Sequence, residues 1–303
     1  MIIITSGNKN LDIDAYASGI AYETLLNSLG KQAKFISTAN FNTSISNLIL
    51  SLNFKVQTNY TKNEEDFFII QDTSSPVTFD KIVDKSKIMK IIDHHKGSED
   101  LWKDCNFNCQ IEYVGAVATL IYEKFVEYKK TNILTQNLCK LLIAAILDNT
   151  LNLKSSATTD RDIKAYNELQ KLGNLTQEFD RDYFISCQET INEDVISAVK
   201  GDIRTDFENY LLPENFGQLL VYDINPVLKN LNDINLLFKE NEEWLINIIN
   251  ISDGKSYIYT TNKSSQIKIE KLLNKKFDNN FIVLDKFKLR KEIIALDISK
   301  NKN

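Results

Sequence analysis

Histidine is scarce in this chain of 303 residues: it occurs only twice, at the adjacent positions His94 and His95. Long apolar runs are also missing, and none approaches the roughly 20 residues that a membrane-spanning helix needs. The N-terminus opens on a strand-like run, Met1 to Ile4, with neither a basic region nor a cleavage site like those of export signals. The sequence therefore predicts a cytoplasmic protein without a membrane segment.

Cysteine is also sparse, with four residues and no CxxC pair. Four are few for a disulfide scaffold of this size, so reduced structural thiols are the expected state. Cys105 and Cys109 are close enough in sequence to leave a metal role open. The chain also lacks internal repeats and low-complexity segments, which favours an ordinary globular fold.

The composition sets a frame for size and charge. With 43% hydrophobic and 25% charged residues, the chain is long enough for about two domains. Its formal net charge is −5, which disfavours nucleic acid as a general partner. An excess of acids instead suits a site that gathers cations.

Up to about residue 185, apolar runs of strand length alternate with amphipathic or buried runs of helix length. This alternation predicts an α/β fold with a doubly wound, mostly parallel sheet. The expected strands are 2–5, 33–36, 67–71 and 88–92, and the expected helices begin near 14, 44, 116, 134 and 163.

Beyond that point the pattern changes to a smaller α+β domain, and we place the boundary after Cys187, giving domains 1–187 and 188–303. A hairpin is expected around Asp253-Gly254, because this dipeptide favours tight turns between strands. The other expected elements are strands at 218–222, 281–284 and 293–296, and helices at 227–240 and 266–273.

Acidic residues and one histidine stand at the ends of four separate predicted elements. Each has an ordinary explanation by itself: Asp14 could cap a helix, and His94 could lie in a solvated turn. Together they offer the oxygen and nitrogen ligands that a pair of divalent cations requires. Mixed imidazole and carboxylate ligands indicate Mn²⁺ first, with Co²⁺ and Mg²⁺ as alternatives. The set comprises Asp12, Asp14, Asp72, His94 and Asp148.

The triplet Asp93-His94-His95, in this setting, resembles the signature of the DHH phosphoesterases. The resemblance extends along nearly the whole chain, because the remaining motifs follow in family order. They are the Asp12-x-Asp14 loop, Asp72 after a strand, the segment 115–119 and Asp148 at a helix end. The resemblance implies a DHH domain in the first half and a DHH-associated, substrate-binding domain in the second.

Two segments of the second half indicate a branch of that superfamily. Residues 201–204 resemble an Asp-x-Lys motif with Arg204 in place of lysine, and residues 289–292 resemble a Ser-Arg-Lys motif with Leu289 in place of serine. These motifs are typical of manganese-dependent inorganic pyrophosphatases, exopolyphosphatases and Prune proteins. Asn8 stands where the pyrophosphatases have a histidine ligand, as in the exopolyphosphatase and Prune version of the loop. An amide oxygen is a poorer ligand than imidazole, which makes Mg²⁺ a better candidate there.

The resemblance also implies a role for each residue. Asp12, Asp72 and Asn8 would hold one metal ion, and Asp72 would bridge to a second ion. That second ion would be held by Asp14, Asp72, His94 and Asp148. Asp93 would orient a histidine, and His95 would bind phosphate and protonate the leaving oxygen. Arg204, Arg290 and Lys291 would bind phosphates as the second domain closes over the substrate.

The leading functional hypothesis is an exopolyphosphatase-like hydrolase that releases phosphate from polyphosphate or short phosphoanhydrides through a metal-activated water. An inorganic pyrophosphatase is the first alternative, and chain-length preference would separate the two. A Prune-like interaction or sensing protein is the second, kept open by Asn8 and Leu289. A nuclease of short oligonucleotides is disfavoured, because few aromatic residues lie near the basic segments.

Overall fold

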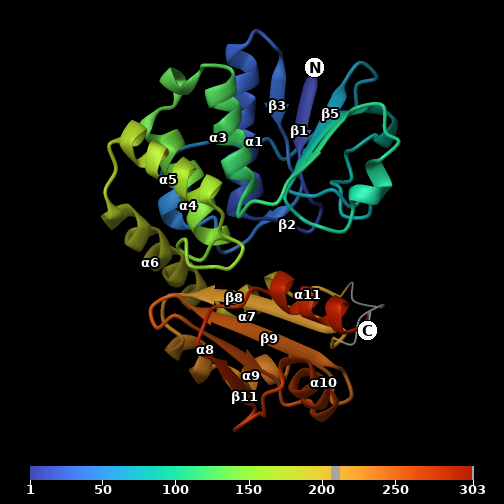
Figure 1. The fold of residues 1–303 in the computed structure, drawn as a ribbon, viewed down its shortest axis with the longest axis vertical. Helices are drawn as coiled ribbons and strands as arrows, with labels where there is room; N and C mark the ends of the chain where they lie inside the picture. Colours follow the sequence, from blue (N-terminus) through green and yellow to red (C-terminus); the bar gives the residue numbers. More distant parts are fainter. Residues whose placement is uncertain (206–211, 302–303) are drawn as a thin grey trace. The chain divides into compact units, whose positions relative to one another are not determined.

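The computed structural model describes residues 1–205 and 212–301 and divides the chain into two units, Met1–Tyr183 and Phe184–Asn303 (Figure 1). Helix α6 (Gln177–Glu193) runs through this division. The boundary expected at residue 187 falls inside the same helix. Among the described residues, no helix is long and apolar enough to cross a membrane.

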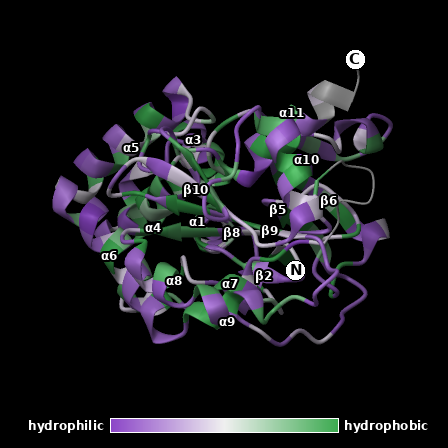
Figure 2. Cartoon of the chain, turned by 90° about the horizontal axis from the view of Figure 1, so that it is seen from below, coloured by the Kyte–Doolittle hydropathy of each residue, from purple (hydrophilic) through white to green (hydrophobic). Residues whose placement is uncertain are grey.

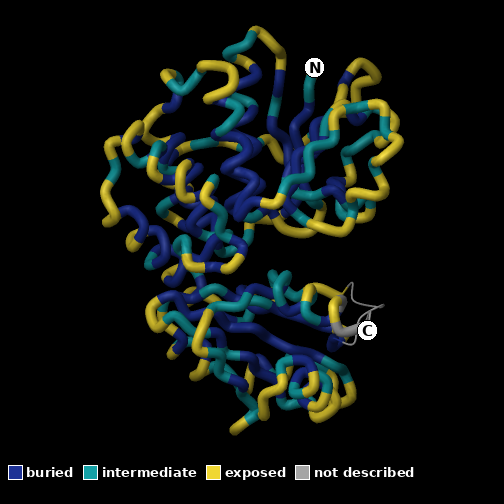
Figure 3. The backbone as a smooth tube through the Cα atoms, in the orientation of Figure 1, coloured by how far each residue is buried: buried dark blue, intermediate teal, exposed yellow. Residues whose placement is uncertain are grey.

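The first unit is built on a five-stranded sheet in which every neighbouring pair of strands is parallel. Its order is β3 (Ala33–Phe35), β1 (Ile2–Thr5), β5 (Phe67–Gln71), β6 (Ile88–Asp93) and β7 (Asn108–Ile111). The central strands are isoleucine-rich and largely buried, as strands covered on both faces must be (Figure 3). The α/β fold predicted from the sequence is confirmed.

The strand order reverses direction between β1 and β5. The chain first steps from β1 outward to β3, and it then resumes on the other side of β1 with β5, β6 and β7. In open α/β sheets, ligands bind outside the carboxyl ends of the strands at such a reversal. The loops that follow β1, β5 and β6 are therefore the expected location of a site.

Connections cover both faces of this sheet. On one face lie α1 (Ile13–Ser28) and α3 (Val117–Glu127), against which α4 (Gln136–Asn149) and α5 (Asp160–Gly173) pack (Figure 1). On the other face, Phe79, Trp102 and Phe107 pack on strand residues. The smaller elements are β2 (Asn10–Leu11), β4 (Asn40–Phe41), α2 (Asn47–Leu50), η1 (Lys85–Lys87), η2 (Glu99–Trp102) and η3 (Thr131–Ile133).

Gly19 allows α1 to approach the sheet closely. A Cβ atom at this position would lie 2.4 Å from ring carbons of Phe35, whose side chain is completely buried. We expect Gly19→Ala to lower the free energy of unfolding by about 1–3 kcal/mol, because overpacking outweighs the better helix propensity of alanine. Urea denaturation tests this, with Gly201→Ala as the control, since nothing lies within 4 Å of a Cβ placed there.

The second unit has a four-stranded mixed sheet in the order β11, β10, β9, β8. Its strands are β8 (Asn215–Val221), β9 (Trp244–Asn250), β10 (Lys255–Tyr259) and β11 (Phe281–Leu284). The strands β8 and β9 are parallel, and the other pairs are antiparallel. The predicted β9–β10 hairpin is present, and Gly254 adopts a left-handed φ of 77° in its turn. The smaller α+β unit is thus confirmed.

Two predicted elements of this unit are wrong. The strand expected at 293–296 lies within helix α11 (Arg290–Asn301), where the Leu289 N–H donates to the Glu292 carboxylate and helps to start the helix. The single helix expected at 227–240 is two short helices, α8 (Asn225–Lys229) and α9 (Leu231–Asn235), which meet at Asn230. The remaining helices are α7 (Val195–Gly201) and α10 (Lys263–Leu273).

Hydropathy explains why the helices of the first unit were easier to predict. Helix α4 has fourteen residues, and nine of them bury apolar side chains. Helices α5 and α6 carry many hydrophilic residues (Figure 2). The sequence pattern therefore predicts α4 and α5 but not α6, whose apolar positions are interrupted by charges.

Candidate metal centre

The carboxyl ends of β5 and β6 bring together three side chains of the types that can hold a metal ion. Asp72 directly follows β5, and His94 and His95 directly follow β6. Each offers one ligand atom, and these atoms all lie within 4.8 Å of one another. Asp72 has a left-handed φ of 58°, and its N–H donates to the Ile92 carbonyl at 3.0 Å. Aspartate tolerates this conformation better than most residues, so the backbone can turn its carboxylate toward the histidines.

His94 is held in one orientation by a backbone carbonyl. Its Nδ1 lies 3.0 Å from the Val114 oxygen. Because a carbonyl can only accept, Nδ1 carries the proton and Nε2 of the neutral ring presents a lone pair. This Nε2 lies 3.4 Å from Asp72 Oδ1 and 4.0 Å from Asp14 Oδ2, and the His94 side chain is 1% exposed. A buried lone pair beside two carboxylates is an arrangement that suits a divalent metal ion.

Asp14 is buried and anchored to the start of α3. Its Oδ2 accepts from the Val117 N–H and its Oδ1 from the Ala118 N–H, both at 2.8 Å. A carboxylate has about four lone-pair positions, so these bonds leave acceptor capacity. The side chain that caps α1 is instead Asp12, which accepts from the Ala15 N–H at 3.0 Å. The capping explanation considered for Asp14 therefore applies to Asp12.

Asp93 orients His95. Its Oδ1 lies 2.8 Å from His95 Nδ1 and also accepts from the backbone N–H groups of His94 and His95. Burial tends to raise the pKa of Asp93, but His95, His94 and the Ser74 hydroxyl outweigh it and hold that pKa below its usual range. The His95 side chain is 42% exposed. Since Nδ1 faces Asp93, Nε2 is the ring atom that can reach a substrate.

Four other predicted ligands, Asn8, Asp12, Asp14 and Asp148, lie outside the group formed by Asp72, His94 and His95. Within residues 1–205 and 212–301, neither Asp12 nor Asp148 joins a third ligand in a set of atoms within 4.8 Å. Asp148, near the end of α4, accepts from the Tyr183 hydroxyl at 2.8 Å. Asn8 is exposed and its amide nitrogen lies 3.4 Å from the Val77 carbonyl. Their roles as ligands are proposals.

The three basic residues predicted to bind phosphate lie in the second unit and differ in environment. The Arg290 side chain is 8% exposed, and its guanidinium contacts Asp202 Oδ1 at 3.1 Å and the Asp202 and Phe216 carbonyls at 2.7 and 2.9 Å. Arg204 is exposed and Lys291 is half-buried. Within this unit, Arg204 and Lys291 are better placed than Arg290 to meet an anion.

The cysteines are not part of the cluster. All four are thiols outside any disulfide, and the one group of possible metal ligands found among the described residues contains none of them. Cys105 Sγ donates to the Phe107 carbonyl at 3.3 Å, and burial raises the pKa of the Cys109 thiol to about 11. The structure gives no support to a metal role for Cys105 and Cys109.

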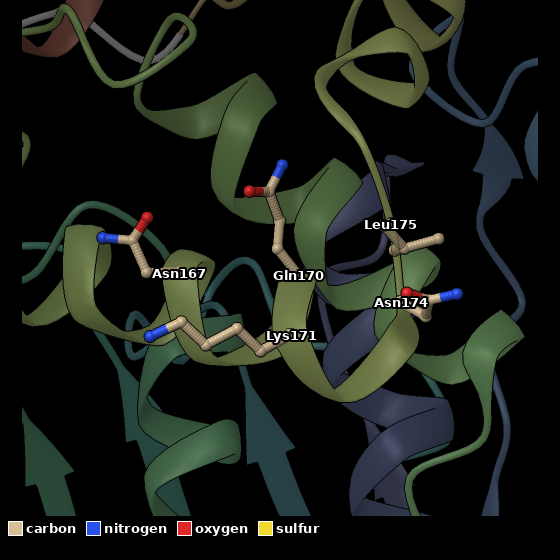
Figure 4. A pocket seen from close by; sticks show the side chains of 5 residues that line it. All are labelled: Asn167, Gln170, Lys171, Asn174 and Leu175. Atoms are coloured by element: carbon tan, nitrogen blue, oxygen red, sulfur yellow. The ribbon is translucent and has the colours of Figure 1, made fainter.

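A separate pocket lies at the C-terminal end of α5 (Figure 4). The residues that line it, Asn167, Gln170, Lys171, Asn174 and Leu175, include no carboxylate, imidazole or thiol among the described part of the chain. The start of α5 lies roughly 20 Å from this pocket, because an α-helix rises about 1.5 Å per residue. This pocket therefore offers none of the chemistry found in the histidine cluster.

Most of the first unit matches the model of a known protein family. Residues 2–146 match the DHH family, N-terminal domain. This segment belongs to the DHH family. The matched residues include Asp12, Asp14 and Asp72 and the triplet from which the resemblance was drawn, so that prediction is confirmed.

Curated relatives of the DHH domain are named as pyrophosphatases. The "probable manganese-dependent inorganic pyrophosphatase" of Lactobacillus delbrueckii subsp. bulgaricus is 29% identical over 171 residues, which are 56% of this chain and 54% of the relative. This chain thus spans about half the length of the relatives that it matches in this way. The manganese-dependent inorganic pyrophosphatase of Bacillus subtilis is 24% identical over 97% of this chain and 96% of the relative.

Solved structures extend the likeness in fold to the second unit. A putative family II inorganic pyrophosphatase of Methanococcus jannaschii aligns over 99% of this chain and all of its own, with a TM-score of 0.79 and 22% identity. An exopolyphosphatase-related protein of Bacteroides fragilis aligns over 99% of this chain and 91% of its own, with a TM-score of 0.54 and 14% identity. The fold of the second unit, like that of the first, is therefore similar to the folds of these solved structures.

Proposed function

We propose that this protein is a metal-dependent hydrolase of inorganic phosphoanhydrides. The observation that carries the proposal is the buried Nε2 lone pair of His94, which faces the carboxylates of Asp72 and Asp14. This arrangement suits a divalent cation and sits at the strand ends where α/β proteins bind ligands. The manganese-dependent relatives support Mn²⁺ as the first candidate ion, with Mg²⁺ and Co²⁺ as alternatives.

The residues divide into two ligand sets that share Asp72. Asp14, Asp72 and His94, with Asp148, would hold one ion, and Asp12, Asp72 and Asn8 would hold another. When bound, such a pair lowers the pKa of a water molecule and stabilises charge on the transferred phosphoryl group. His94 keeps its Nε2 aimed inward because Val114 fixes the other ring nitrogen.

His95 has a different task from His94. Asp93 holds its Nδ1, which leaves Nε2 on the exposed side of a ring that is 42% accessible. In its protonated form the ring can bind an anionic oxygen and donate a proton to the leaving group. By the family resemblance, Arg204 and Lys291 would bind phosphate, and Arg290 would have a smaller part because Asp202 already pairs with it.

Asn8 supports a preference for polyphosphate over pyrophosphate. It supplies an amide where the pyrophosphatases have a histidine, and its Nδ2 points to the Val77 carbonyl. An amide oxygen binds a transition metal less strongly than imidazole does. The names of the curated relatives favour the second candidate, an inorganic pyrophosphatase.

Phosphate release from pyrophosphate, tripolyphosphate and long-chain polyphosphate, each with Mn²⁺ and with Mg²⁺, tests the proposal. We expect release that EDTA abolishes and that added metal restores, with the longer chains preferred. Preference for pyrophosphate would select the second candidate. No release from any of the three by metal-loaded protein would contradict hydrolysis and favour a Prune-like sensing role.

The Tyr183 hydroxyl tests whether Asp148 is a ligand. This hydroxyl lies 2.8 Å from Asp148 Oδ1 and 3.2 Å from the Ser44 carbonyl, and its single proton favours the charged, nearer acceptor. We expect Tyr183→Phe to weaken Mn²⁺ binding by about 10-fold, the usual cost of losing a hydrogen bond that orients a metal ligand. Isothermal titration with Mn²⁺ measures the change.

Tyr166→Phe is the matched control for this experiment. Tyr166 also donates to a buried carboxylate, that of Asp180, but this pair is not among the ligating residues. Its loss should lower stability without altering Mn²⁺ affinity. Equal affinity in Tyr183→Phe and the wild type would remove Asp148 from the ligand set.

A further inference from the structure

Asp162 is a completely buried carboxylate that the roles above do not use. It lies in the first turn of α5, where its Oδ2 accepts from the N–H and the hydroxyl of Thr159, at 2.8 and 2.7 Å. Its Oδ1 accepts from the Thr119 hydroxyl of α3 at 2.6 Å. These contacts alone would explain the residue as a helix cap that also joins two helices.

A further contact goes beyond helix capping. Asp162 Oδ2 also accepts from the Gly115 N–H at 2.8 Å. That N–H belongs to the same peptide group as the Val114 carbonyl, which lies 3.0 Å from His94 Nδ1. One planar peptide group therefore connects a buried carboxylate on one side to the imidazole of His94 on the other.

The sequence around this peptide is adapted to so close an approach. A Cβ atom on residue 115 would lie 2.9 Å from Asp162 Oδ2 and 2.4 Å from Thr150 Cγ2, so only glycine fits without displacement. Two and three residues further, the N–H groups of Val117 and Ala118 donate to Asp14. The turn held by Asp162 thus contacts two of the proposed metal ligands.

The physical consequence follows from polarisation along a hydrogen-bonded chain. A negative charge at the N–H end of a peptide group makes its carbonyl oxygen a stronger acceptor. A stronger acceptor at Nδ1–H makes the opposite nitrogen of imidazole a better ligand, as a directly bonded carboxylate does in many metal sites. Here the carboxylate acts from one peptide group further away.

We propose that Asp162 is a positioning residue for the metal centre, which acts through the Val114–Gly115 peptide group to fix the tautomer of His94 and strengthen its Nε2 as a ligand. The inference rests on the proposed function in that it takes His94 as a metal ligand. It does not depend on which phosphoanhydride is the substrate.

Asp162→Asn separates this role from helix capping. The asparagine oxygen can keep the contacts to Gly115 and Thr159, while its NH₂ group faces Thr119, whose hydroxyl can accept instead of donating. The shape and the hydrogen bonds are retained and the charge is lost. Glu168→Gln is the matched control, because Glu168 lies on the same helix and accepts from Tyr122 of α3 at 2.8 Å, away from the turn.

The measurement is Mn²⁺ affinity of the full chain, by isothermal titration with the metal alone. We expect Asp162→Asn to weaken binding by about 10-fold, as changes to groups that support metal ligands do, and Glu168→Gln to bind as the wild type does. Wild-type affinity in Asp162→Asn would overturn the proposal. Because no substrate is present, a failure here is distinguishable from an absence of hydrolytic activity.

A second measurement uses the unmodified protein and so does not depend on how the variant folds. With only two histidines in the chain, the ¹⁵N spectrum of the imidazole rings can be assigned with the single variant His95→Gln. The proposal predicts that metal-free His94 is held as the Nδ1–H tautomer. An Nε2–H tautomer, or exchange between the two, would overturn it.

Discussion

Asp72→Ala is expected to abolish phosphate release while the protein stays folded. Asp72 is assigned to both metal ions, and its Oδ1 already lies 3.4 Å from His94 Nε2. Losing a shared ligand removes several kcal/mol of charge stabilisation in the transition state, which corresponds to a loss of about 10³-fold or more in rate. Initial rates with Mn²⁺ and saturating substrate measure the effect.

The backbone at Asp72 dictates the control for that experiment. Its φ of 58° is unfavourable for alanine but acceptable for asparagine. Asp72→Asn should therefore keep the fold more fully and still lose activity, because the amide lacks the charge that a bridging ligand needs. Asp84→Ala removes another acid of the same unit, one that caps η1, and should retain full activity. Substantial activity in Asp72→Asn would contradict the two-metal assignment.

His95→Gln is expected to lower kcat by about 10²–10⁴-fold, the usual contribution of a proton donor, with little change in Mn²⁺ affinity. The reason is geometric: Asp93 engages Nδ1, and Nε2 lies on the accessible side of the ring. His94→Gln should do the opposite and lose metal binding first, because His94 Nε2 faces the carboxylates.

Parallel rate and metal titrations on these two variants make the comparison. Adding excess Mn²⁺ should partly restore His94→Gln, because its defect is in metal affinity, and should not restore His95→Gln. The same response to excess metal in both variants would show that the two histidines share one role, contrary to the assignment made here.

Much of the first unit was predictable because its physical signals are local. The isoleucine-rich runs at β1, β5 and β6 are typical of buried strands, and each ends in a polar residue, Thr5, Gln71 or Asp93, that is itself buried. Since parallel strands bring their carboxyl ends to one edge, Asp72 and His94 were expected to meet, and they do. The hairpin at Gly254 was likewise predictable from the dipeptide Asp253-Gly254.

The unpredicted parts depend on contacts between distant segments. Strand β7 is a partly exposed edge strand without apolar alternation, so it becomes a strand only by pairing with β6. Helix α11 was mistaken for a strand because Ile293 to Leu296 is apolar, and the Glu292 side chain that favours the helix carries no strong sequence signal. The pairing of Arg290 with Asp202 joins residues 88 positions apart.

The backbone groups of the site were the least predictable. The Val114 carbonyl and the N–H groups of Val117 and Ala118 orient His94 and Asp14, yet backbone atoms leave no trace in residue types. The only sequence clue was Gly115, whose missing side chain allows Asp162 to approach. A motif search that considers side chains alone therefore finds the proposed ligands but not what holds them in place.

The most direct test of the account is a crystal structure of the Mn²⁺-soaked protein with anomalous diffraction recorded at the manganese edge. We predict an anomalous peak within bonding distance of His94 Nε2 and Asp72 Oδ1, with Asp14 as a further ligand. The same crystals should show His95 Nδ1 still bonded to Asp93. A protein that takes up Mn²⁺ but shows no peak at His94 and Asp72 would contradict the central claim that this cluster is the metal centre.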